Sequence, residues 1–169
     1  WRFMFQPDFG LFKAFFDVLF PPLADVDWLG DPILAMIALV GSDVWHFTPF
    51  LTLVFIGGLA TVPKDAQEAA TIDGATSWMV FRDVTLPSIL PVLAVGIVLK
   101  SIFSLKMFDQ VYMLTNGGPA YATQTLAHYI YFNGFKYYDM GYASAVSYML
   151  VIPMFGLTWV YMKLVFLKR

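Results

Sequence analysis

The chain has 169 residues and a formal net charge of −2, from 10 Lys and Arg against 12 Asp and Glu. Hydrophobic residues make up 59% and charged residues 13%, against roughly 45–50% and ~25% in ordinary soluble domains. This composition excludes a disordered chain and disfavours a soluble globular domain, whose outer shell needs more polar surface. The weak acidity gives no footprint for nucleic acid. Cysteine is absent, which excludes disulfides, thiol catalysis and cysteine-ligated metals.

The N-terminal part of the chain precedes the first long apolar stretch. Because it starts at Trp1 without a signal pattern, we expect it to come from the interior of a longer protein, truncated at its N-terminus. Residues 6–32 are predicted to form an external segment with an interfacial helix near residues 11–20. The consecutive prolines Pro21 and Pro22 stop that helix, since neither can continue it.

Three long apolar stretches cover about residues 33–62, 86–106 and 142–167. A helix needs about 20 apolar residues to cross the ~30 Å hydrocarbon core of a bilayer. The stretches therefore predict an all-α membrane protein, a polytopic helical bundle with about three spans. The alternative is three buried helices in a large soluble core, which periodicity does not exclude but length and low charge disfavour.

Basic residues near the span ends predict the orientation of the chain, because cytoplasmic connections carry more Lys and Arg. One side holds five basic residues and the other side holds two. They are Lys64, Arg82, Lys163, Lys168 and Arg169 on the first side, and Lys13 and Lys136 on the second. The 63–85 connection is therefore predicted to be cytoplasmic, and segments 6–32 and 107–141 to be external.

The residue pattern of the 63–85 connection predicts two short helices with a break between them. Pro63 suits the first turn of a helix, and Gly74 can end that helix in a left-handed conformation. A second helix is predicted from residue 76 to 84, with Thr85 capping the next span. From the residues alone, this connection is either a plain hairpin joining two spans or a compact knob with a docking role.

The same connection holds a longer pattern of residues at fixed spacing. It consists of Glu68-Ala69-Ala70, Ile72-Asp73-Gly74-Ala75, Phe81, Thr85-Leu86-Pro87 and Pro91. The pattern resembles the EAA loop of permease subunits of binding-protein-dependent ABC importers. Phe108 to Tyr112, Gly117-Gly118-Pro119 and Gly141 to Ala145 extend the resemblance to the carbohydrate (maltose/glycerol-3-phosphate) type. It implies the type I importer permease fold, with residues 1–169 as the C-terminal part of one transmembrane domain.

The resemblance also implies a function and a set of partners. The chain would belong to a multi-pass permease that moves a sugar or related solute across the cytoplasmic membrane of a bacterium or archaeon. ATP and Mg would bind to a separate ATPase subunit dimer, and this chain would hold no cofactor. A second, non-identical permease, an extracytoplasmic solute-binding protein and membrane lipid would be the other partners. The residues implied to transmit ATP-driven closure are Glu68, Ala69, Ala70, Asp73, Gly74 and Ala75.

Candidates for the solute path carry aromatic or hydrogen-bonding side chains near the external side. They are Trp45, Phe108, Asp109 and Tyr112, although packing explains each of them as well. The chain contains no Gly-x-x-x-x-Gly-Lys phosphate loop, His-Glu-x-x-His metal motif or Gly-x-Ser-x-Gly elbow, so we expect neither catalysis nor a metal. Two alternatives stay open: an ion-driven transporter that uses Asp43 or Lys100, and a non-transporting membrane scaffold.

Overall fold

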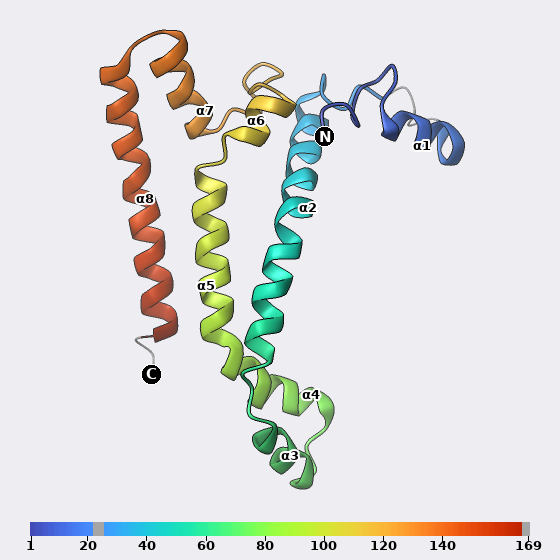
Figure 1. Cartoon of the computed structure of the whole chain (residues 1–169), viewed down its shortest axis with the longest axis vertical. Coiled ribbons are helices and arrows are strands. Elements are labelled where there is room, and N and C mark those ends of the chain that lie inside the picture. The colour runs from blue at the N-terminus through green and yellow to red at the C-terminus, as the bar shows by residue number, and fades with distance from the viewer. Residues whose placement is uncertain (22–25, 167–169) are drawn as a thin grey trace. The chain divides into compact units, whose positions relative to one another are not determined.

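The computed structural model describes residues 1–21 and 26–166, and all regular structure in these residues is helical (Figure 1). The prediction of an all-α protein is therefore confirmed. The helices in chain order are α1 (Leu11–Leu19), α2 (Pro32–Leu59), α3 (Lys64–Ile72), α4 (Ser77–Val80), the π-helical turn η2 (Phe81–Thr85), α5 (Leu86–Leu105), α6 (Asp109–Leu114), α7 (Leu126–Tyr131), the π-helical turn η3 (Phe132–Lys136) and α8 (Met140–Phe166).

Three helical stretches are long and apolar enough to cross a membrane: Pro32–Leu59, Ser77–Leu105 and Met140–Lys163, of 28, 29 and 24 residues. At ~1.5 Å per residue, each exceeds the ~30 Å of a hydrocarbon core. No more than 17% of the apolar stretch of each helix is buried inside the chain. The three predicted spans are therefore confirmed, and their exposed apolar surface needs lipid or other helices to cover it.

Two predicted span boundaries differ from the observed ones. The first span ends at Leu59 rather than at residue 62, because Pro63 disfavours the α conformation of the residue before it. Thr61 and Val62 instead form turn hydrogen bonds to Gly58 and Leu59. The third span begins at Met140, two residues earlier than predicted, and its predicted last residue, 167, lies outside the described residues.

The second span begins far earlier than predicted, since α4, η2 and α5 form one continuous helix from Ser77 to Leu105. The prediction that Thr85 caps a new helix is wrong. The cap is Thr76, whose side chain accepts a hydrogen bond from the Met79 backbone at 3.4 Å. The π-helical turn η2 lies directly before Pro87, and its wider backbone leaves room for a ring that clashes with the carbonyl four residues back in a regular helix.

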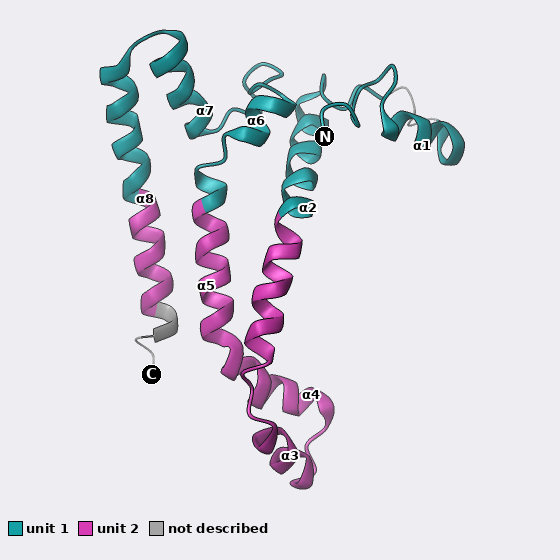
Figure 2. Cartoon of the chain, viewed as in Figure 1, with its two compact units in different colours: residues 1–46, 103–152 teal, residues 47–102, 153–169 magenta. Residues whose placement is uncertain are grey.

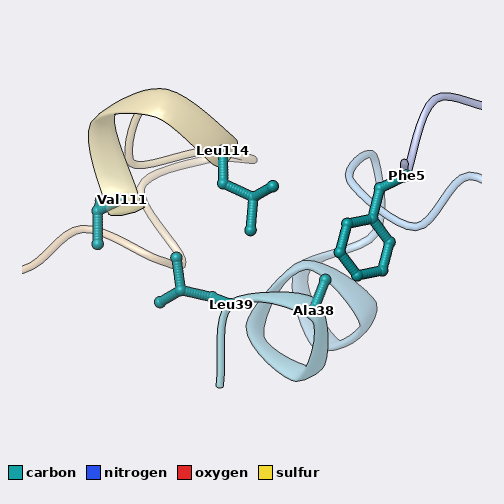
Figure 3. Close-up of a cluster of buried hydrophobic side chains, with 5 residues drawn as sticks. All are labelled: Phe5, Ala38, Leu39, Val111 and Leu114. Carbon is teal, nitrogen blue, oxygen red and sulfur yellow. The ribbon is translucent and has the colours of Figure 1, made fainter. Parts of the chain in front are cut away.

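The contacts within the chain divide it into two compact units, residues 1–46 with 103–152 and residues 47–102 with 153–169 (Figure 2). In the first unit, a small apolar core joins the N-terminal segment and α2 to α6. Figure 3 shows its members, which are Phe5, Ala38, Leu39, Val111 and Leu114. Segment 6–32 contains α1, as predicted near residues 11–20. α1 ends at Leu19, and the predicted stop at Pro22 lies outside the described residues.

Candidate functional site

α3 follows Pro63 directly and ends in a glycine-terminated turn. Gly74 has a φ of +84°, a left-handed conformation in which a glycine has no steric penalty. Its backbone N–H donates to the Thr71 carbonyl at 3.1 Å, and the Ala75 N–H donates to the Ala70 carbonyl at 3.0 Å. This pair of bonds is a Schellman motif, and it confirms that Gly74 ends the helix.

α3 lies on the surface of its unit, beside α4 and η2 (Figure 1). None of its residues is buried. The six residues implied to couple the chain to an ATPase fall into two groups, of which the first is exposed and the second half-buried. The exposed group is Glu68, Ala69, Asp73 and Gly74, and the half-buried group is Ala70 and Ala75. The structure thus brings all six to one short helix and the turn after it, with the carboxylates at exposed positions.

An open cleft of about 610 Å³ lies between α3 and the α4–η2 helix, with Glu68, Thr71 and Phe81 among its lining residues. Large apolar side chains border it. Ile72 and Phe81 line the cleft and are 86% and 41% exposed, and Trp78, which contacts Phe81, is 65% exposed. The Trp78 and Phe81 rings stack at a centroid distance of 5.6 Å. Apolar groups exposed on an otherwise polar connection are typical of a surface that binds another protein.

One hydrogen bond connects α3 to the helix that continues into the membrane span. The Gln67 Nε2 donates to the Thr85 Oγ1 at 3.1 Å, across 18 residues of sequence. Thr85 is buried. This contact was not predictable from the sequence, because nothing in the local pattern brings a glutamine of one helix to a threonine in the next.

Two of the predicted solute-path residues meet in an aromatic cluster of the first unit. The Phe108 and Tyr112 rings stack at 5.3 Å, and the Phe108 and Tyr131 centroids lie 4.8 Å apart. His128 lies beside these rings, at 6.3 Å from both Phe108 and Tyr112 and 4.5 Å from Phe132. The cluster joins α6 to α7 and η3.

Of the other two predicted path residues, Trp45 lies on α2, and Asp109 follows Phe108 as the first residue of α6. Trp45 is 71% exposed on α2, and its ring meets Trp1 edge to face at 6.4 Å. Asp109 lines a cavity of about 240 Å³ together with Trp1, Arg2 and Ser42. Trp1 thus contacts the Trp45 ring and lines the same cavity as Asp109. The role of the four candidates in a solute path stays a prediction.

His128 is the centre of the first unit's polar interior, which the sequence analysis did not single out. It is 1% exposed, and burial lowers its pKa below the ordinary value of 6.5. Its Nε2 lies 3.4 Å from Asn116 Oδ1, whereas its Nδ1 has no hydrogen-bond partner among the described residues. Gly117 has a φ of +81° and packs so closely that a Cβ there would come within 2.8 Å of the ring. A lone histidine in a run of aromatic residues was the only available signal.

The cationic residues near the span ends contact aromatic rings. The Lys100 Nζ lies 4.1 Å from the centre of the Phe47 ring, and the Lys106 Nζ lies 4.9 Å from that of Phe103. Cation–π contacts of this kind stabilise a charge that is partly removed from water. Within residues 1–21 and 26–166, no group of three or more His, Asp or Glu side chains is placed to hold a metal ion.

Three membrane-length helices and one exposed helical connection define a polytopic helical membrane protein. Residues 3–166 match the family described as the inner membrane component of binding-protein-dependent transport systems. The chain belongs to this family. Its localisation is accordingly the inner membrane, as a multi-pass protein.

Several permeases resemble the chain over most of its length. The trehalose/maltose transport system permease MalF of Thermococcus litoralis is 40% identical over 163 residues, 96% of this chain and 54% of that protein. The sulfoquinovosyl glycerol permease SmoG of Agrobacterium fabrum is 35% identical over 82% of this chain and 45% of that protein. The inner membrane ABC transporter permease YcjO of Escherichia coli is 34% identical over 92% of this chain and 52% of that protein. The chain thus spans about half the length of these relatives.

Proposed function

We propose that the chain is part of the permease subunit of an ABC importer that moves a sugar or related solute across the inner membrane. The observation that carries this proposal is the 63–85 connection. Its α3 helix has no buried residue, places Glu68, Ala69 and Asp73 at exposed positions, and ends at a left-handed glycine. Two relatives whose names specify carbohydrate-containing solutes support the solute class.

The partners follow from the same proposal. An ATPase subunit dimer, which binds ATP and Mg, docks on the cytoplasmic side against α3 and the neighbouring cleft. A second permease, not identical to this one, completes the path through the membrane. A solute-binding protein delivers solute at the external side, near α6 and α7. Lipid covers the apolar surface that the three long helices leave exposed.

The proposal assigns the 63–85 connection the task of transmitting movement. An exposed helix with few buried contacts opens locally at low free energy, and a bound partner stabilises it. Small side chains at Ala69 and Ala70 allow that partner's backbone to come close, and Gly74 fixes the direction in which the chain reverses. ATP-driven closure of the ATPase dimer then moves α3, and through it the membrane helices.

The test uses the full-length permease, reconstituted in proteoliposomes with its partner permease, ATPase subunits and binding protein. ATP-dependent uptake of labelled maltose and trehalose is measured beside ATP hydrolysis. Gly74→Pro should lower uptake more than about tenfold while hydrolysis persists, because proline cannot adopt the positive φ at this position and removes the N–H bonded to Thr71. Unchanged uptake in this variant contradicts the coupling role.

The same vesicles separate the alternatives. Uptake that needs a proton or sodium gradient, and proceeds without the ATPase subunits, identifies an ion-driven transporter. A fully assembled complex that shows neither uptake nor solute-stimulated hydrolysis identifies a scaffold. Gly74→Ala is the matched control, since a Cβ at this position meets no atom within 4 Å. Its effect should be smaller than that of Gly74→Pro.

A further inference from the structure

Few contacts hold α3 to the rest of its unit. Only Gln67 and Ala70 of its residues are even half-buried, and they share one face of the helix because they are three residues apart. Among the described residues, the bond from Gln67 to Thr85 is the only side-chain hydrogen bond between α3 and another helix. α3 otherwise lies beside α4 and η2 and is held by the chain connections before and after it.

Thr85 occupies the point at which the exposed connection becomes the membrane helix. It is the last residue of η2, where the Leu86 N–H donates to the Phe81 carbonyl five residues back. Such π-helical turns are frequent at functional sites. The helix continues without a break from Ser77 to Leu105, so a displacement at Thr85 acts directly on the span.

We propose that the Gln67–Thr85 hydrogen bond is the link through which α3 moves the membrane helix. This inference rests on the coupling function proposed for residues 63–85. Glu68 and Ala69 are exposed where a partner can bind, whereas the neighbouring Gln67 reaches inward to Thr85. One turn of α3 thus carries both the outer and the inner contact. Without the inner contact, α3 can tilt about its two chain connections while the span stays still.

The experiment measures the ratio of solute taken up to ATP hydrolysed, in the same proteoliposomes and with labelled maltose and trehalose. Gln67→Leu and Thr85→Val should each lower this ratio about fivefold, the factor expected for one hydrogen bond. The double variant should fall no further than either single variant, because both remove the same bond. Thr85→Ser keeps the hydroxyl and should restore the wild-type ratio.

Thr52→Val is the matched control. It also exchanges a helical threonine for valine, but the Thr52 hydroxyl donates to the Thr48 carbonyl within α2, at 2.8 Å, and Thr52 does not line the cleft. Its ratio should equal that of the wild type. Co-purification of the ATPase subunits verifies that every variant assembles. If Thr85→Val fails to assemble, the Thr85→Ser and Gln67→Leu variants still decide the question.

Three results overturn the inference. The first is a Gln67→Leu ratio within about twofold of the wild type, because a lost hydrogen bond predicts a larger change. The second is additive losses in the double variant. The third is a Thr85→Ser variant that is as impaired as Thr85→Val. A wild-type complex that takes up neither sugar is a different failure. It excludes maltose and trehalose as the solutes, and it is distinguishable from the three results above, which concern the Gln67–Thr85 bond.

Discussion

The connections before and after α5 differ in what stabilises them. Between α2 and α5, neither α3 nor α4 has a buried residue, and Ile72 and Trp78 are largely exposed. Between α5 and α8, α6 buries Val111 and Leu114, and α7 buries His128. One side-chain hydrogen bond, from Gln67 to Thr85, joins the helices of the first connection, whereas the second packs buried side chains, some of them against the N-terminal segment and α2.

This difference indicates what each connection is built to do. A segment with few buried contacts opens locally at low free energy and becomes ordered when a partner covers it. A segment whose side chains are buried within the folded chain keeps its shape without a partner and presents a preformed surface. We therefore expect the 63–85 connection to contribute to partner binding and the 107–139 connection to contribute to stability. Equivalent substitutions in the two connections test this expectation.

The largest contrast is expected from removing one large side chain in each connection. His128→Ala should lower the local stability of residues 107–139 by about 2–4 kcal/mol, because it empties a buried site. Trp78→Ala should cost only ~0.5–1.5 kcal/mol, since its side chain is 65% exposed and mainly loses its stacking on Phe81. Amide hydrogen exchange on the full-length protein in nanodiscs measures both. Equal loss of protection in the two variants contradicts the comparison.

A glycine with positive φ occurs in each connection, which makes a second matched pair. Gly117→Ala and Gly74→Ala both force alanine into a left-handed conformation, at ~1–2 kcal/mol each. Gly117→Ala adds a clash, because its Cβ would lie 2.8 Å from the His128 Cε1, whereas the site at Gly74 is open. We expect the Gly117 variant to be less stable by a further ~1–3 kcal/mol. Thermal unfolding in detergent compares the two, and a larger loss at Gly74 is the contrary result.

Each connection also contains a short helix capped by threonine. Thr76→Ala should cost ~1 kcal/mol, because it removes the acceptor for the Met79 N–H. Thr125→Ala removes the acceptor for the His128 N–H and also the bond that its hydroxyl donates to the Met107 carbonyl at 2.7 Å. Its cost should therefore be about twice as large. Hydrogen exchange at the first turns of α4 and α7 gives both values, and a greater loss at Thr76 runs against the comparison.

The smallest effect is a pH dependence confined to the 107–139 connection. Burial lowers the pKa of His128 in the folded chain, so the unfolded chain binds the proton more readily. The neighbours Asn116, Phe108, Tyr112 and Phe132 carry no charge at neutral pH to offset this. The stability that His128 contributes should be complete above pH 6.5, the ordinary pKa, and should fall as the pH drops through the lowered folded value.

The measurement for this prediction is the unfolding temperature from pH 8 to 5, followed for the wild type and two histidine variants. His128→Gln should flatten the part of the profile that belongs to residues 107–139. His46→Gln, at the only other histidine, should leave that part unchanged. A profile that His128→Gln leaves untouched contradicts the assignment.

Much of the fold was predictable because it depends on local pattern. The lengths and low charge of the apolar stretches predicted three spans, and Pro63 and Gly74 predicted the bounds of α3. The start of the second span was not predictable in this way. Thr85 before Leu86-Pro87 has the pattern of a cap, but the helix runs through it as a π-helical turn. Whether a proline begins a helix or is accommodated inside one depends on the turn before it.

The candidate site, like the fold, was predictable where its residues are close together in the sequence. The six residues of the coupling pattern lie within eight consecutive positions, so the sequence alone placed them on one short helix and its C-terminal turn. Of the path candidates, Phe108, Asp109 and Tyr112 lie within five residues at the start of α6, and Trp45 lies on α2. The four-residue spacing of Phe108 and Tyr112 is that of helix neighbours, and their rings stack. No feature of the sequence placed Trp1 beside Trp45 and in the cavity that Asp109 lines.

The sequence by itself thus determined the class of this protein, its membrane helices and the exposed helix between the first two. These depend on composition, on length against the thickness of a bilayer, and on residues a few positions apart. Only the tertiary structure decided the partner of Gln67, the buried position of His128 beneath Gly117, and the continuity of the helix through Thr85. The physical reason is that these features require close packing of side chains that are distant in sequence or a backbone adjustment that local propensity does not encode.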